Sequence, residues 1–297
     1  MDYSDIRLTV FTPTYNRRDT LPKGYGALLR QTNKNFVWLI IDDGSTDDTV
    51  SLVREWQGRD NGFEIRYCYK ENGGLHTGYN KAIELMDTEL CVCIDSDDYM
   101  PNNAVELILD FWEKRGSDEY AGIIALDCYE NGGIIGGRLP EVDSLYMIEL
   151  ETKYKRRGDT KMVLRTELLK KVAPQQSYAG EKNFNPIYML LKVGDNYPFL
   201  ILNENLCFVE YQQGGMSNNI FRQYVNSPNS FAALRLLNMR LKRTTFSYRF
   251  RQHIHYVSSC ILAGRSNVFK ESPNKLMTFA ALLPGVLLYF YIKLKIR

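Results

Sequence analysis

The feature that most constrains the fold of this chain is a regular alternation of strand-like and helix-like segments over its first 115 residues. The run from Phe36 to Ile41 is continuously apolar, which is typical of a strand covered on both faces. The expected strands are residues 8–11, 36–41, 64–69 and 90–94, and the expected helices are residues 19–32, 46–56, 78–86 and 103–115. This alternation predicts an α/β fold in which a mostly parallel sheet is flanked by helices.

A cluster of polar residues follows each of these four expected strands. The clusters read TPTYNR, DDGSTDD, ENGG and DSDD in chain order. In open parallel sheets, ligands bind outside the carboxyl ends of the strands. Because all four clusters fall at those ends, we expect them to meet along one edge of the sheet and to form a ligand site there.

The rest of the chain is less regular, and its charge changes sign. Residues 160–172 are expected to form either a strand or a helix. Up to Glu210 the chain has 24 Lys and Arg against 34 Asp and Glu, whereas the remainder has 13 basic residues and one acid. We therefore predict one domain over residues 1–218 and a helical, basic C-terminal region over residues 219–297 that binds an anionic partner.

The C-terminal region ends in an apolar segment, residues 276–292, which carries no charge. A membrane-spanning helix needs about 20 apolar residues, so this segment is short for a span. We expect an anchor that lies in the plane of the membrane or re-enters it. The alternatives for this segment are a membrane-spanning helix and a helix pair packed on the main domain. Because the chain opens without a signal-like segment, we expect a cytoplasmic protein, peripheral on the inner face of the membrane.

The DSDD cluster has the composition of a metal site. Asp95 and Asp97 share one side of an extended backbone, so both carboxylates can reach the same point. Several carboxylates close together are unfavourable without a cation, and Mg²⁺ or Mn²⁺ accepts carboxylate together with phosphate oxygens. Asp98 is also suited to capping the helix that follows. Asn72-Gly73-Gly74 offers backbone N–H groups to an anion, and His76 is expected either to contact the ligand or to be exposed.

Taken together, the motifs resemble glycosyltransferase family 2. The segments that carry the resemblance are TPTYNR (residues 12–17), IIDDGSTDDT (40–49), NGG followed by Asn80-Lys81-Ala82, and IDSDDY (94–99). The resemblance is strong over residues 6–110 and loose over residues 111–218. It implies the Rossmann-like GT-A fold and transfer with inversion at the anomeric carbon.

The resemblance also implies roles for single residues. Thr12, Pro13 and Tyr15 resemble the wall that holds the nucleobase, and Asp43 the carboxylate that reads it. Asp95 resembles the ribose contact and Asp97 the metal ligand. The complete expected donor-binding set is Thr12, Pro13, Tyr15, Asp43, Gly73, Gly74, His76, Asn80, Asp95 and Ser96, with Asp97 and Asp95 holding Mn²⁺ or Mg²⁺.

At the expected catalytic base the sequence departs from the pattern of the family. The family carries a Glu-Asp pair whose Asp often acts as the base, but the matching stretch here reads Gly180-Glu181-Lys182. Glu181 is therefore the expected base, and an exposed loop glutamate is the alternative. The segment from Glu210 through residues 214–217 resembles the part that closes over the donor.

These residues predict a metal-dependent glycosyltransferase. We expect a nucleotide-diphosphate sugar donor, with UDP as the nucleotide, and a saccharide or lipid-linked saccharide acceptor in cell-surface polysaccharide synthesis. A sugar nucleotidyltransferase is the alternative enzyme, although TPTYNR is not a glycine-rich phosphate loop. An inactive sugar-nucleotide-binding or scaffold protein is the alternative outside enzymes. Nucleic-acid binding is not expected, because the basic region ends in an apolar segment.

Overall fold

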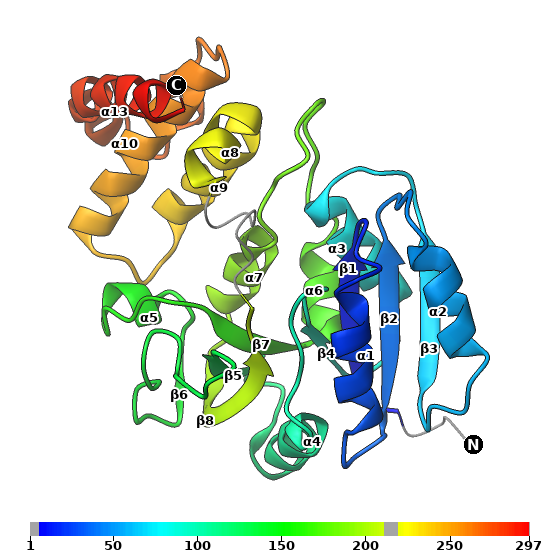
Figure 1. The fold of residues 1–297 in the computed structure, drawn as a ribbon. Helices are drawn as coiled ribbons and strands as arrows, with labels where there is room; N and C mark the ends of the chain where they lie inside the picture. The colour runs from blue at the N-terminus through cyan, green and yellow to red at the C-terminus, as the bar shows by residue number, and fades with distance from the viewer. Residues whose placement is uncertain (1–5, 211–218, 297) are drawn as a thin grey trace.

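In the computed structural model, which describes residues 6–210 and 219–296, one mixed eight-stranded sheet forms the centre of the molecule (Figure 1). The strand order is β3-β2-β1-β4-β7-β5-β8-β6. The strands are β1 (Leu8–Thr14), β2 (Phe36–Asp42), β3 (Glu64–Tyr69), β4 (Leu90–Cys93), β5 (Gly122–Cys128), β6 (Ser144–Leu145), β7 (Thr160–Arg165) and β8 (Phe199–Phe208).

The first four strands are parallel, as the alternation predicts. β7 is antiparallel to both of its neighbours, β4 and β5, while β5 and β8 are parallel to each other. The carboxyl ends of β1, β2, β3, β4, β5 and β8 therefore lie along the same edge of the sheet. The polar clusters of the sequence meet at this edge.

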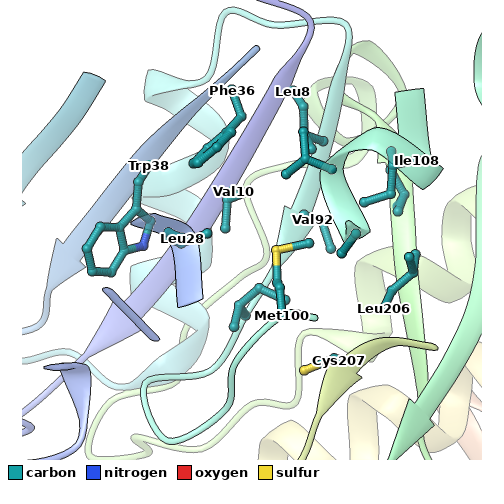
Figure 2. Packing of buried hydrophobic residues seen from close by; sticks show 14 of the residues in the cluster. Leu8, Val10, Leu28, Phe36, Trp38, Val92, Met100, Ile108, Leu206 and Cys207 are labelled. Atoms are coloured by element: carbon teal, nitrogen blue, oxygen red, sulfur yellow. The ribbon is translucent and has the colours of Figure 1, made fainter. Parts of the chain in front are cut away.

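Helices cover both faces of the sheet because alternate strand residues face opposite sides. One core contains Leu8 and Val10 together with side chains of α1 (Leu21–Leu29), α2 (Thr49–Gln57) and α4 (Ala104–Arg115) (Figure 2). The other core contains Phe11 with side chains of the helices on the opposite face, namely α3 (Leu75–Leu85), α5 (Glu149–Thr152), α6 (Thr166–Val172) and α7 (Ile187–Gly194). The buried faces fix the strand register that aligns the polar clusters.

The C-terminal region is helical, as expected, and consists of α8 (Ile220–Asn226), α9 (Pro228–Arg240), α10 (Phe246–Leu262), α11 (Val268–Glu271), α12 (Lys275–Ala280) and α13 (Leu282–Lys295). α9 packs along α10, and Leu234 and Tyr248 join the core on the α3 side of the sheet. α12 and α13 pack on α10 at the end of the molecule farthest from β3 (Figure 1). Within the described ranges, none of the helices combines the length and apolar character needed to cross a bilayer.

Residues 160–172 form both of the expected alternatives. Thr160–Arg165 is strand β7, and Thr166–Val172 is helix α6. The boundary between the predicted domains at residue 218 falls outside the described residues and stays a prediction.

Candidate active site

The loops after β1 and β2 are joined by hydrogen bonds at the sheet edge. Asn16, which has a positive φ of 52°, donates its N–H to Ser45 Oγ over 2.9 Å and accepts from Thr46 N–H over 2.8 Å. Tyr15 beside it is 48% exposed, so its ring is available to a ligand. Thr12 is buried, and its hydroxyl accepts a hydrogen bond from the indole N–H of Trp38 at 3.0 Å. Of the predicted nucleobase wall, Tyr15 is therefore presented to solvent, whereas Thr12 is buried and its hydroxyl is bound by Trp38.

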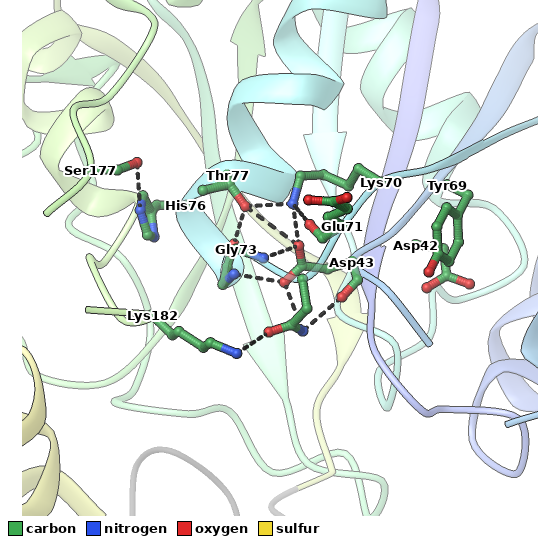
Figure 3. Close-up of polar contacts among 12 residues, drawn as sticks. Asp42, Asp43, Tyr69, Lys70, Glu71, Gly73, His76, Thr77, Ser177 and Lys182 are labelled. Carbon is green, nitrogen blue, oxygen red and sulfur yellow. Dashed lines mark hydrogen bonds and ion pairs between the residues drawn. The ribbon is translucent and has the colours of Figure 1, made fainter. Parts of the chain in front are cut away.

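The carboxylate of Asp43 lies within the loop that follows β3 (Figure 3). Gly73 N–H donates to Oδ1 over 2.9 Å, and Gly74 N–H donates to Oδ2 over 2.7 Å. Lys70 also contacts the carboxylate closely, and Asn72 Nδ2 donates to the Asp43 carbonyl oxygen over 2.7 Å. The N–H groups predicted for an anion thus bind the anion that this chain supplies itself. A nucleobase would reach Asp43 only at the small part of it that remains exposed.

Gly74 permits this arrangement. Its φ is 93°, and a Cβ at this position would lie 1.9 Å from the carbonyl oxygen of Lys182. A glycine is therefore required for the loop after β3 to approach the Lys182 segment. Lys182 itself donates to Asn72 Oδ1 over 2.6 Å, so the loop around Asp43 is held from both sides (Figure 3).

The DSDD cluster lies at the end of β4. Asp95 is exposed, and Asp97 is half-buried. Burial raises the pKa of Asp97, and the neighbouring Asp95 raises it further, whereas Arg17 acts in the opposite direction. The ionised form of Asp97 is thus unfavourable without a cation, and its hard oxygen ligands suit Mg²⁺ or Mn²⁺. No group of three or more potential ligands occurs among the described residues, so phosphate oxygens and water would have to complete the coordination.

A buried charge cluster lies beneath DSDD and was missed by the sequence analysis. Lys161 of β7 is 8% exposed, and its Nζ lies 3.7 Å from Oδ1 of Asp127, which is 2% exposed. Burial raises the pKa of Asp127 to about 6 and that of Asp98 to about 7, in both cases against the attraction of Lys161. Burial lowers the pKa of Lys161, but the carboxylates around it, Asp127 first, raise it well above its ordinary value. Lys161 is thus the internal cation of the acidic site.

Asp98 connects this cluster to the end of β8. Its Oδ1 accepts the backbone N–H of Glu210 over 3.2 Å, and it does not cap α4 with a side-chain hydrogen bond. The capping role suggested for Asp98 is therefore wrong. The Glu210 carboxylate accepts from Lys23 over 2.6 Å, and Lys23 also contacts Glu130 and lies 4.7 Å from the centre of the Tyr99 ring. The ends of β5 and β8 are thereby tied to α1 beside DSDD. Residues 214–217 lie outside the described residues.

Two other predicted donor contacts have partners within the protein. Asn80 exchanges two hydrogen bonds of 2.8 Å with the backbone of Gln175, which attaches α3 to the segment after α6. His76 is 1% exposed, and its Nε2 lies 3.0 Å from Ser177 Oγ. Burial lowers the pKa of His76, which favours the neutral form of its ring. The alternative that His76 is simply exposed is wrong. Gly73 and Gly74 donate to Asp43, as described above. Ser96, which separates Asp95 and Asp97 in the sequence, is buried.

Glu181 is bound at the start of α9. Its Oε1 accepts from the backbone and side-chain nitrogens of Asn229 at 2.8 Å each, and its Oε2 accepts from Ser230 N–H and Oγ at 2.8 Å and 2.6 Å. The residue is 7% exposed, so the alternative of an exposed loop glutamate is wrong. A carboxylate at a helix N-terminus is stabilised by the free N–H groups and the helix dipole. This environment is that of a structural carboxylate, and the role of Glu181 as base stays a prediction.

Glu181→Gln separates the two roles. If the carboxylate holds α9, the variant should lose about 1–3 kcal/mol of unfolding free energy, because a charged acceptor of four hydrogen bonds is replaced by an amide. Transfer per folded molecule should then change little, whereas loss of a general base would lower kcat by about 10²–10⁴-fold. Thermal unfolding and initial rates measure the two effects. Glu204→Gln, at an exposed position of β8, is the matched control and should change neither.

The comparisons with known proteins bear on the family and the fold. The model of the family described as glycosyl transferase family 2 matches residues 9–172, more than half of the chain. The chain belongs to glycosyl transferase family 2. The expected GT-A type fold is confirmed as well, because solved glycosyltransferases of this architecture superpose on almost the whole chain.

One curated relative and two solved structures illustrate what the chain is similar to. The chondroitin synthase of Escherichia coli is 32% identical over 107 residues, which are 36% of this chain and 15% of that protein. The S. aureus TarS structure with UDP-GlcNAc has a TM-score of 0.62 at 17% identity and covers 94% of this chain and 80% of its own. The mannosyltransferase PcManGT from Pyrobaculum calidifontis, solved with GDP-Man and Mn²⁺, has a TM-score of 0.58 at 16% identity and covers 98% and 81%. The chain matches only 15% to 42% of the length of five other curated relatives.

Proposed function

We propose that this family 2 glycosyltransferase transfers a sugar from a UDP-sugar to a saccharide acceptor, with inversion at the anomeric carbon. The observation that carries the proposal is the alignment of Tyr15, the Asp43 loop and the Asp95–Asp97 pair along one sheet edge. An exposed ring suits the nucleobase, and the acidic pair suits the diphosphate end of the donor through a cation. Arg17, whose charge acts to lower the pKa of Asp97, adds a positive charge for the diphosphate. The UDP-GlcNAc complex of TarS, which shares the fold, supports the choice of nucleotide.

The residues fit a divalent metal, and we propose Asp97 and Asp95 as its protein ligands. When bound, Mg²⁺ or Mn²⁺ neutralises the diphosphate and makes it a better leaving group. Asp97 would hold the donor through that charge, while Lys161 keeps the acidic cluster from repelling the diphosphate when the metal is absent. The Mn²⁺ in the PcManGT structure supports this assignment.

For the acceptor, we propose a lipid-linked saccharide presented at the inner face of a membrane, where the protein is peripheral. The support is the basic C-terminal region and the occurrence, among the relatives, of a chondroitin synthase and of a putative teichuronic acid biosynthesis glycosyltransferase. The acceptor hydroxyl needs a base on the side opposite the leaving group. Glu181 can serve only if Asn229 and Ser230 release it, since both of its oxygens already accept hydrogen bonds.

The residue that follows Glu181 favours a second candidate, an inactive sugar-nucleotide-binding protein. Lys182 stands where the family often has its catalytic Asp, and it is bound to Asn72. Such a protein would retain the donor site without transferring or hydrolysing the donor.

Calorimetric titration of the purified chain with UDP and with GDP, each with and without Mn²⁺, tests the proposal. We expect UDP to bind more tightly when Mn²⁺ is present and GDP to bind at least about tenfold more weakly, a difference of 1.4 kcal/mol. Absence of binding for both nucleotides would contradict a donor site. Metal-dependent UDP binding without hydrolysis or transfer of any UDP-sugar would favour the inactive protein.

A further inference from the structure

Helices α12 and α13 present a row of large apolar side chains to solvent. Leu276 is 83% exposed, Leu283 is 70% exposed, and Phe290, the least exposed of the row, is 58% exposed. Within each helix, spacings of three or four residues place these side chains on one side. We call it the outer apolar stripe, and it consists of Leu276, Phe279, Leu283, Leu287, Phe290 and Leu294. A contiguous exposed apolar surface of this kind marks an interaction site.

The opposite side of the same helices is already packed against the protein. Gly285 lies so close to α10 that a Cβ there would be 2.6 Å from Val257 Cβ. Ile292 is 2% exposed, and Thr278 is joined to His253 by a hydrogen bond of 2.8 Å. Because this inner side is fixed on α10, α12 and α13 have one apolar face left over. The outer apolar stripe is therefore a second apolar face, separate from the face by which the helices pack on the protein.

The charges around the stripe favour an anionic partner. Lys275 begins α12, and Lys293 and Lys295 lie in the last turn of α13. Glu271 is the one acid of the sequence after Glu210, and it is paired with Arg265 at 3.1 Å. A neutral apolar protein surface would gain nothing from these lysines, whereas an anionic lipid headgroup attracts them at about 1 kcal/mol each.

We propose that the outer apolar stripe is a membrane-docking surface that inserts into the headgroup layer of an anionic bilayer, with α12 and α13 lying in the membrane plane. The arrangement matches an interfacial helix, which has one apolar face and basic flanks. It extends the proposed function, which supplies only the reason for a membrane location. In Figure 1 the carboxyl ends of β1 and β2 point toward the side of the molecule on which α13 lies. The donor edge and α13 therefore lie toward the same side of the molecule.

Flotation of the full chain with lipid vesicles tests this proposal. Wild type should float with vesicles of phosphatidylcholine and phosphatidylglycerol and much less with phosphatidylcholine alone. The variant Leu283→Ser/Leu287→Ser/Phe290→Ser should lower the partition coefficient by at least about tenfold, because three apolar side chains no longer enter the bilayer. Phe246→Ser is the matched control, since Phe246 is 74% exposed at the far end of α10, and it should float like wild type.

The electrostatic part has its own pair of variants. Lys293→Glu/Lys295→Glu should weaken flotation and its salt sensitivity, whereas Lys114→Glu on α4 should not. Equal flotation of the stripe variant and wild type would overturn the proposal. So would a wild type that does not float but forms a dimer that the stripe variant abolishes, because the stripe would then contact a second copy. UDP binding and the unfolding temperature should stay unchanged in every variant, so a failed donor site is distinguished from a failed docking surface.

Discussion

Asp97→Asn should abolish the Mn²⁺ dependence of nucleotide binding and lower transfer by at least about 10²-fold, because a bound cation contributes several kcal/mol to stabilising the leaving diphosphate. The amide has the shape of the carboxylate but no charge, so the change removes the metal and little else. Calorimetry with UDP and Mn²⁺ measures the first effect, and initial rates of transfer or donor hydrolysis measure the second.

The same variant should not be less stable than wild type. Because the pKa of Asp97 is raised by burial and by Asp95, its ionised form is unfavourable in the fold, and a neutral side chain removes that penalty. The unfolding temperature is therefore expected to stay the same or to rise. Asp110→Asn, at an exposed position of α4, is the matched control and should leave binding and rate unchanged. Retained Mn²⁺-dependent binding in Asp97→Asn would remove Asp97 from the metal site.

Local sequence patterns were sufficient for the parallel half of the sheet. A buried parallel strand has a continuous apolar sequence, and the run Phe36–Ile41 has the length of a strand and is short for a buried helix. The polar residues that follow such strands are carried to one edge by the parallel topology, so TPTYNR, DDGSTDD and DSDD could be placed together without knowing any contact. The contacts that hold this edge together could not be predicted from local sequence patterns.

The partners of single side chains could not be predicted because they are distant in the sequence. Glu181 resembled a family base, yet its oxygens are bound by Asn229 and Ser230 at the start of another helix. Asn80 likewise binds Gln175, 95 residues away. Lys161 lies in the segment 160–172, which was expected to form either a strand or a helix and gave no sign that this lysine is buried. Its environment depends on β7 entering the sheet antiparallel between β4 and β5, a non-local pairing.

Lys161→Met should be the most destabilising single substitution in the site. Removing one partner of a buried ion pair leaves an uncompensated charge and costs about 3–5 kcal/mol. Here the lysine faces more than one carboxylate, since Asp127, Asp98 and Asp95 all contribute to raising its pKa. Chemical denaturation at pH 8 measures the loss. Lys170→Met on α6 makes the same chemical change at an exposed position and should stay within about 0.5 kcal/mol of wild type.

The pH dependence identifies the cause of that loss. The pKa of Asp127 is about 6 in the fold against 3.8 in the unfolded chain, so between these values the folded state holds a proton that the unfolded state releases. Stability from this group therefore falls as the pH rises through that window. Without Lys161 the folded pKa of Asp127 should rise further, and the deficit of Lys161→Met should be largest at pH 8 and shrink toward pH 5. Adding Asp127→Asn should recover part of it at pH 8. If the deficit is the same at both pH values, the lysine stabilises the acidic site through the packing of its stem and not through its charge.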